Sequence, residues 1–131
     1  MLTKRAIGKL TVEGTPENVS TIVKTVLPLI GISFAGQKVV SEKPLVSEIY
    51  AMRAPSWKSF GESVEIRLCE IAQGQTLIEA KSECLASQLI FDYGRNKKNL
   101  ESLFGELAKR LKTTAPANLE EKRWGTDLQK E

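Results

Sequence analysis

The chain has 131 residues, of which 41% are hydrophobic and 27% are charged, and its formal net charge is +3. This length and composition predict one globular domain with a single hydrophobic core. Its 19 Lys and Arg residues are mixed with 16 Asp and Glu residues, and aromatic residues make up only 6% of the chain. The sequence therefore lacks the dense basic stripe and interleaved aromatics of a nucleic-acid-binding protein, and we do not expect nucleic acid as a partner.

The residue types of common catalytic and metal sites are missing. There is no histidine, which removes the most common general base and zinc ligand. The nine glycines form neither a dinucleotide-binding nor a P-loop pattern. We expect no catalytic residue, metal or cofactor, and hence no enzyme. No apolar run near the N-terminus is long enough for a signal peptide or membrane span, so a cytoplasmic protein without a membrane partner is expected.

The N-terminal part is predicted to form a strand and then a helix. The alternation of side chains within residues 3–13 predicts a strand. Thr15 suits the N-cap of a helix and Pro16 suits its first position, and apolar residues recur at helical spacing over residues 19–30. Pro28 is expected to kink this helix or to end it about one turn early.

Two hairpins are predicted to follow. Residues 32–41 and 45–53 are rich in β-branched and aromatic side chains around a Ser-Glu-Lys-Pro turn. In the next hairpin, apolar faces meet if opposed residue numbers sum to 146, which pairs Ile66 with Ala80. This register requires a three- or five-residue loop in which Gly74 takes a positive φ.

The same register fixes the charged residues and cysteines of this hairpin. It places Glu65 opposite Lys81 and Arg67 opposite Glu79, so these carboxylates are interpreted as cross-strand partners of the two cations. It also turns Cys69 away from the core, opposite Leu77, and Cys84 toward the core, opposite Glu62. Cysteines on opposite faces of a sheet form neither a disulfide nor a metal site, so reduced thiols are expected.

The last predicted helix spans residues 93–112, with leucines and a phenylalanine on its inner face and Glu106 paired with Arg110 outside. Residues 1–112 are expected to form the single domain, and residues 113–131 a flexible or loosely docked C-terminal tail. The element order predicts an α+β fold. This is a two-layer sandwich, β-α-β-β-β-β-α, with two helices packed on one face of an antiparallel sheet.

This element order resembles the TATA-box-binding-protein-like fold and its helix-grip elaboration, lipid-binding domains of the START type. Locally, Trp-Lys-Ser-Phe-Gly-Glu at residues 57–62 and Asp-Tyr-Gly-Arg-Asn-Lys-Lys-Asn at residues 92–99 together resemble a pairing in small uncharacterised bacterial α+β domains. That resemblance covers roughly residues 49–111 and carries over no function or site.

Two sequence features could mark a binding site. The first is the loop around Trp57 and Phe60, whose aromatics either recognise a partner or close the open end of the core. The second is the positive charge at the start of the last helix, where it opposes the helix dipole. The candidate anion or partner contacts are Arg95, Lys97, Lys98 and Lys58. They form an anion site, or they are a solvated face in which Asp92 caps the helix and Lys97 pairs with Glu101.

Two functions remain open at this point. The first is a non-catalytic binding or protein-interaction domain that contacts a partner, or a second copy, through its exposed sheet face. The alternative is a carrier of a small apolar or anionic ligand, with a pocket between the sheet and the C-terminal helix. A filled core with an apolar surface patch would favour the first, and a cavity between helix and sheet the second.

Overall fold

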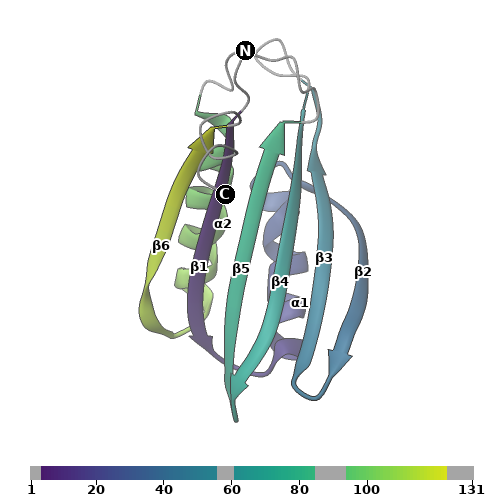
Figure 1. The fold of residues 1–131 in the computed structure, drawn as a ribbon, viewed down its shortest axis with the longest axis vertical. Helices are drawn as coiled ribbons and strands as arrows, with labels where there is room; N and C mark the ends of the chain where they lie inside the picture. The colour runs from purple at the N-terminus through teal and green to yellow at the C-terminus, as the bar shows by residue number, and fades with distance from the viewer. Residues whose placement is uncertain (1–3, 56–60, 85–93, 124–131) are drawn as a thin grey trace.

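The computed structural model describes residues 4–55, 61–84 and 94–123, which form one antiparallel sheet with both helices on the same face (Figure 1). In chain order the elements are β1 (Lys4–Glu13), α1 (Pro16–Leu29), β2 (Ser33–Glu42), β3 (Leu45–Arg53), β4 (Glu62–Ala72), β5 (Gln75–Cys84), α2 (Arg95–Arg110) and β6 (Thr113–Arg123). The spatial order of the six strands is β2-β3-β4-β5-β1-β6. This confirms the predicted two-layer α+β class.

Helix α1 begins as predicted and ends later than predicted. Thr15 is the N-cap, and its Oγ1 accepts a hydrogen bond from the Asn18 amide at 3.2 Å. Pro28 lies in the last turn, and the helix continues to Leu29. A proline there costs only a terminal hydrogen bond, so it does not shorten the helix by a turn.

The β4–β5 hairpin has the predicted register. Ile66 lies opposite Ala80, and Gly74 has a φ of 73°. The loop differs from the prediction, because the turn has only two residues and a bulge lies between Glu70 and Ala72. The bulge inserts one extra residue, which reconciles a two-residue turn with the register that packing requires.

The core lies between the sheet and the two helices. Its fully buried side chains include Leu103 and Leu107 of α2, which pack with sheet residues such as Ile78. Gly8 on β1 is needed for this packing. A Cβ at Gly8 would lie 2.7 Å from Phe104 Cε2 and closer still to Leu119 Cδ2. The space between the middle of β1 and α2 is therefore filled by side chains.

The predicted C-terminal tail is wrong for residues 113–123, which form the edge strand β6 and pair with β1. The strand was missed because, among the described residues, no strand pairs with its outer edge and only Leu119 packs against the core from it. Pro116 lies where the pairing with β1 shifts register, and edge strands tolerate proline at such irregularities. Residues 124–131 lie outside the described part of the chain.

Candidate functional site

The three predicted cations at the start of α2 differ in their surroundings. Arg95 is half-buried, and its Nε lies 3.6 Å from Glu62 Oε1, whereas Lys97 and Lys98 are exposed. The N-cap of α2 is Gly94, in the left-handed region with a φ of 71°. Lys58, Trp57, Phe60 and Asp92 themselves lie outside the described residues.

Arg95 belongs to a buried polar network centred on Glu62. The Glu62 side chain is 0% exposed, and its Oε1 accepts a hydrogen bond from Asn99 Nδ2 at 2.9 Å. Arg53 Nε donates to Asn99 Oδ1 at 2.8 Å, and its Nη2 donates to the carbonyl of Ile30. Glu62 therefore links α2 to β4, while Arg53 links both to the end of α1.

Further hydrogen bonds extend this network along β5. Asn99 Nδ2 also donates to Ser82 Oγ at 3.2 Å, and Ser82 Oγ donates to Asn96 Oδ1 at 2.8 Å. Burial lowers the pKa of Arg53, the positive charge of Arg95 lowers it further, and Glu62 opposes both effects. Because buried polar groups are costly unless they are hydrogen-bonded, the network anchors α2 on the sheet in one position.

A groove of about 360 Å³ lies between α2 and β6. Its lining is mostly small or apolar and consists of Leu10, Glu101, Phe104, Gly105, Ala108, Thr113, Ala115, Pro116, Ala117 and Leu119. A Cβ added at Gly105 would meet nothing within 4 Å. The groove exists because glycine and alanine on α2 face alanines and a proline on β6, so no long side chain fills the space.

This groove is at the sheet edge, beside the filled centre of the core. The carrier hypothesis placed a pocket between the sheet and the C-terminal helix, but sequence reasoning missed these residues. It missed them because one wall of the groove is β6, which the sequence predicts to be part of a C-terminal tail. The signal was the run of small residues over positions 113–117, which cannot fill space against the small residues of α2.

A second groove, of about 340 Å³, lies between α1 and β2–β3 and has a more polar lining. Side chains bridge it. Gln37 Nε2 donates to Ser20 Oγ at 2.8 Å, and Lys24 Nζ donates to Gln37 Oε1 at 3.0 Å. These hydrogen bonds tie α1 to the edge strand β2, which is a sufficient structural reason for the polar residues there.

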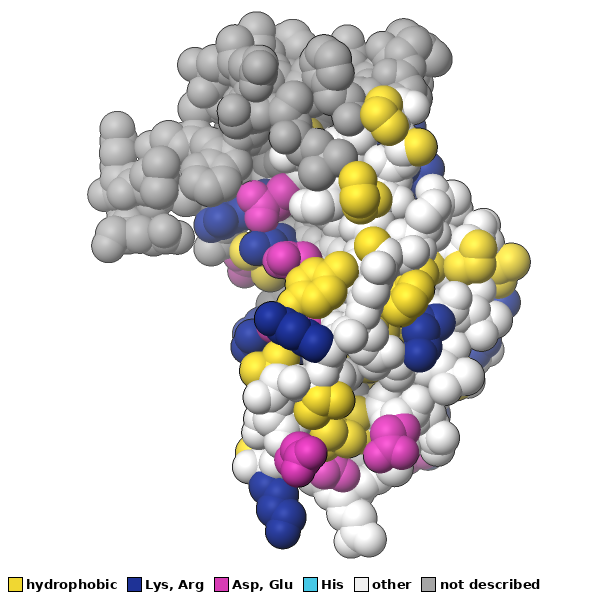
Figure 2. All heavy atoms as spheres, turned by 90° about the vertical axis from the view of Figure 1, so that its right-hand side faces the viewer, with side chains coloured by type: hydrophobic (Ala, Val, Ile, Leu, Met, Phe, Trp, Pro, Cys, Tyr) yellow, Lys and Arg dark blue, Asp and Glu magenta, His cyan; other side chains and the backbone are white. Residues whose placement is uncertain are grey.

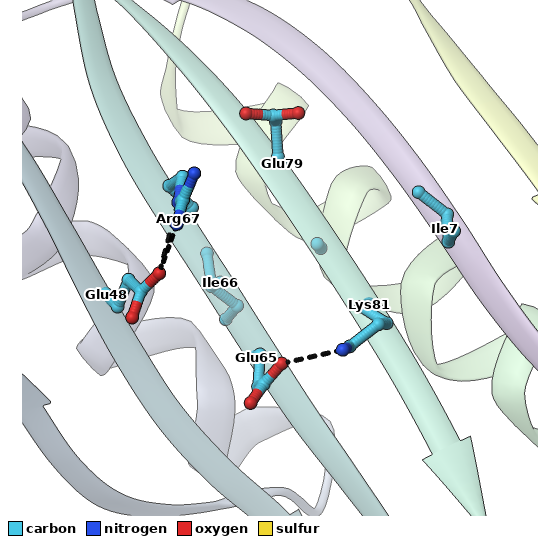
Figure 3. A pocket seen from close by; sticks show the side chains of 8 residues that line it. Ile7, Glu48, Glu65, Ile66, Arg67, Glu79 and Lys81 are labelled. Carbon is cyan, nitrogen blue, oxygen red and sulfur yellow. Dashed lines mark hydrogen bonds and ion pairs between the residues drawn. The ribbon is translucent and has the colours of Figure 1, made fainter.

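The outer face of the sheet carries paired charges around a hollow of about 250 Å³ (Figure 3). Lys81 pairs with Glu65 at 3.0 Å, as predicted. Arg67 lies opposite Glu79 in the register but points to Glu48 on β3, at 2.7 Å. Sequence reasoning identified the cross-strand position and missed the third strand, which offers Arg67 a nearer carboxylate.

Exposed large apolar side chains gather elsewhere, at the β2 edge of the molecule (Figure 2). Phe34, Val39 and Val40 of β2 are between 46% and 59% exposed. The pairing of β2 with β3 shifts register at two places, around Ala35 and around Val40. Such bulges hinder an edge strand from pairing with the strand of another molecule. The outer sheet face, where self-association is expected from the sequence, carries the charged pairs Arg67–Glu48 and Lys81–Glu65.

Within residues 4–55, 61–84 and 94–123, no group of three acidic or cysteine side chains could hold a metal ion. Neither helix is long and apolar enough to cross a membrane.

No family model matches the sequence, and no curated protein matches it. Solved structures with a similar fold include a START superfamily protein from Mycobacterium smegmatis, at 12% identity and a TM-score of 0.46, over 80% of this chain and 92% of that one. Zhui aromatase/cyclase from Streptomyces sp. R1128 has 13% identity and a TM-score of 0.47, over 82% and 95%. A truncated norcoclaurine synthase from Thalictrum flavum has 11% identity and a TM-score of 0.48, over 82% and 93%. These similarities concern the fold alone.

Proposed function

We propose that this chain is a small-molecule binding protein that holds an apolar ligand in the groove between α2 and β6. The observation that carries the proposal is the groove itself. Its volume of about 360 Å³ is within the usual range for small-molecule sites, and its walls are mostly apolar. An apolar ligand that covers these walls removes their surface from water. This burial contributes a favourable free energy of roughly 25 cal/mol per Å² of apolar surface.

The surroundings of the groove support a preformed site. The Glu62 network holds the N-terminal half of α2 against the sheet, and Phe104 and Leu119 pack tightly over Gly8 at the floor. A rigid site loses little conformational freedom when a ligand binds, so more of the contact energy contributes to affinity.

The lining supports binding more than it supports chemistry. Among the described residues that line the groove, Glu101 is the one ionisable side chain and Thr113 carries the one hydroxyl. General acid–base catalysis by protein groups would need a second titratable group or an activated nucleophile within hydrogen-bond reach of the ligand.

The proposal is tested by filling the groove. We expect phenylnaphthylamine, an uncharged apolar dye, to bind saturably with a rise in fluorescence. Gly105→Leu is expected to abolish this binding, because the new side chain occupies open space. It should also raise the free energy of unfolding by about 0.5–1 kcal/mol, since glycine weakens a helix interior.

The matched control is Lys109→Leu, which adds the same side chain to an exposed position of α2 that does not line the groove. Lys109→Leu should bind the dye as the natural protein does. Dye binding that survives Gly105→Leu, or no binding by the natural protein, would overturn the proposal.

A further inference from the structure

We propose that the ligand of the α2–β6 groove carries a positively charged group, such as a protonated amine, and that Glu101 pairs with it. This inference rests on the proposed function and assigns the charge of the ligand. Glu101 is the one ionisable residue among the described residues that line the groove, and its side chain is exposed there. A ligand that fills the groove therefore meets this carboxylate and no other charged side chain of the described lining.

Glu101 differs from the other carboxylate of α2. Glu106 pairs with Lys109 at 2.8 Å and with Arg110 at 2.8 Å, and these hydrogen bonds lower its pKa. In the part of the chain that the structure describes, Glu101 makes no ion pair within 4 Å. One carboxylate of the helix is thus neutralised by its neighbours, and the carboxylate at the groove is left for another cation.

The nearby cations of the chain do not take this role. Lys97 and Lys98 precede Glu101 by four and three residues, and a lysine before a glutamate is the weaker orientation of a helical pair. Lys112, after the helix, pairs with Glu13 at 3.6 Å. The expected pairing of Lys97 with Glu101 is not found among the described residues.

Three ligands of similar shape and different charge test the inference: naphthylethylamine, naphthylethanol and naphthylacetate. Each competes with phenylnaphthylamine at neutral pH and low salt. The natural protein should bind the amine roughly twofold to fivefold more tightly than the alcohol, the range expected for an exposed ion pair, and the carboxylate more weakly. Glu101→Gln should make the affinities of the amine, the alcohol and the carboxylate similar, and it should leave the affinity for the alcohol unchanged.

Glu106→Gln is the matched control, because it removes a carboxylate from the same helix outside the groove. It should keep the preference for the amine. If the alcohol binds and the natural protein does not prefer the amine, the inference fails and the proposed function stands. If none of the three ligands displaces the dye, the inference fails, and the proposed function is decided by the Gly105→Leu comparison. Equal loss of preference in Glu101→Gln and Glu106→Gln would assign the effect to overall charge and overturn the role of Glu101.

Discussion

Asn99 Nδ2 donates a hydrogen bond to Glu62 Oε1 at 2.9 Å, which joins the second turn of α2 to the first residue of β4. Both side chains are at most 2% exposed. The side-chain oxygen of Asn99, Oδ1, also accepts a hydrogen bond from Arg53 Nε. The Asn99 side chain therefore connects the buried Glu62 with the half-buried Arg53. This contact fixes where α2 lies on the sheet and therefore where the groove opens.

Replacing Asn99 with alanine should lower the free energy of unfolding by about 2 kcal/mol, because it leaves buried donors and acceptors without their partner. Asn118→Ala is the control. Because Asn118 is exposed on β6, this change should lower the free energy of unfolding only slightly. Urea denaturation measures both. A loss of less than about 0.5 kcal/mol in Asn99→Ala would contradict a structural role for the network.

The predicted cationic site separates into a buried and an exposed part. Arg95→Gln should destabilise the fold by about 1–2 kcal/mol, because Glu62 loses a nearby positive charge. The double change Lys97→Gln and Lys98→Gln should preserve stability or raise it by a few tenths of a kcal/mol, because like charge leaves the positive end of the helix. Thermal unfolding measures the melting temperatures of the two variants and of the natural protein.

The same variants test the anion hypothesis. Phosphate should raise the melting temperature of the natural protein and of the double lysine variant equally, as expected for a solvated face. A smaller rise in the variant would place an anion site at the start of α2 and contradict our expectation.

The outer sheet face should contribute an acid-sensitive part of the stability. Hydrogen bonds from Tyr50 and Arg67 hold the pKa of Glu48 below its usual value. A lowered folded-state pKa stabilises the protein above the unfolded value of about 4.3, and this contribution is lost as the pH falls through the folded value. The free energy of unfolding should therefore differ less between pH 7 and pH 3 in Glu48→Gln than in the natural protein. Urea denaturation at the two pH values measures this difference. An unchanged difference would contradict the assignment.

The β4–β5 register was predictable because two independent constraints agree on it. Only one register buries Ile66 against Ala80 and also opposes Glu65 and Lys81. That register also turns Glu62 inward, opposite Cys84. A carboxylate facing the core was thus the available signal for the buried network. Its partners could not be named, because Arg53 and Asn99 come from elements whose relative placement depends on tertiary packing.

Strand β6 was not predictable from periodicity. Among its described side chains, only Leu119 packs against the core, so the strand gives almost no alternation. Its pairing with β1 is made by backbone atoms, which do not depend on the side chains. The groove was not predictable either, because it is formed by the small side chains of α2 and β6, and β6 was not recognised as a strand.

The role of β6 makes a further prediction. Leu119→Ser should destabilise the protein by about 1–3 kcal/mol, because Leu119 packs over Gly8 beside Phe104. Asn118→Ser, the neighbouring change on the same strand, should be close to neutral. Chemical denaturation compares the two variants. Equal, small losses would mean that residues 113–123 behave as the tail expected from sequence.

The most direct test of the central claim is to locate the uncharged dye by amide chemical-shift changes in a nitrogen–proton NMR spectrum. If the dye binds in the α2–β6 groove, the largest changes fall at Gly105, Ala108 and Ala117, and Gly36 on the far edge strand stays unchanged. Changes concentrated at the α1–β2 groove, around Ser20 and Gln37, would contradict it, as would a saturating titration without changes at Gly105 and Ala108.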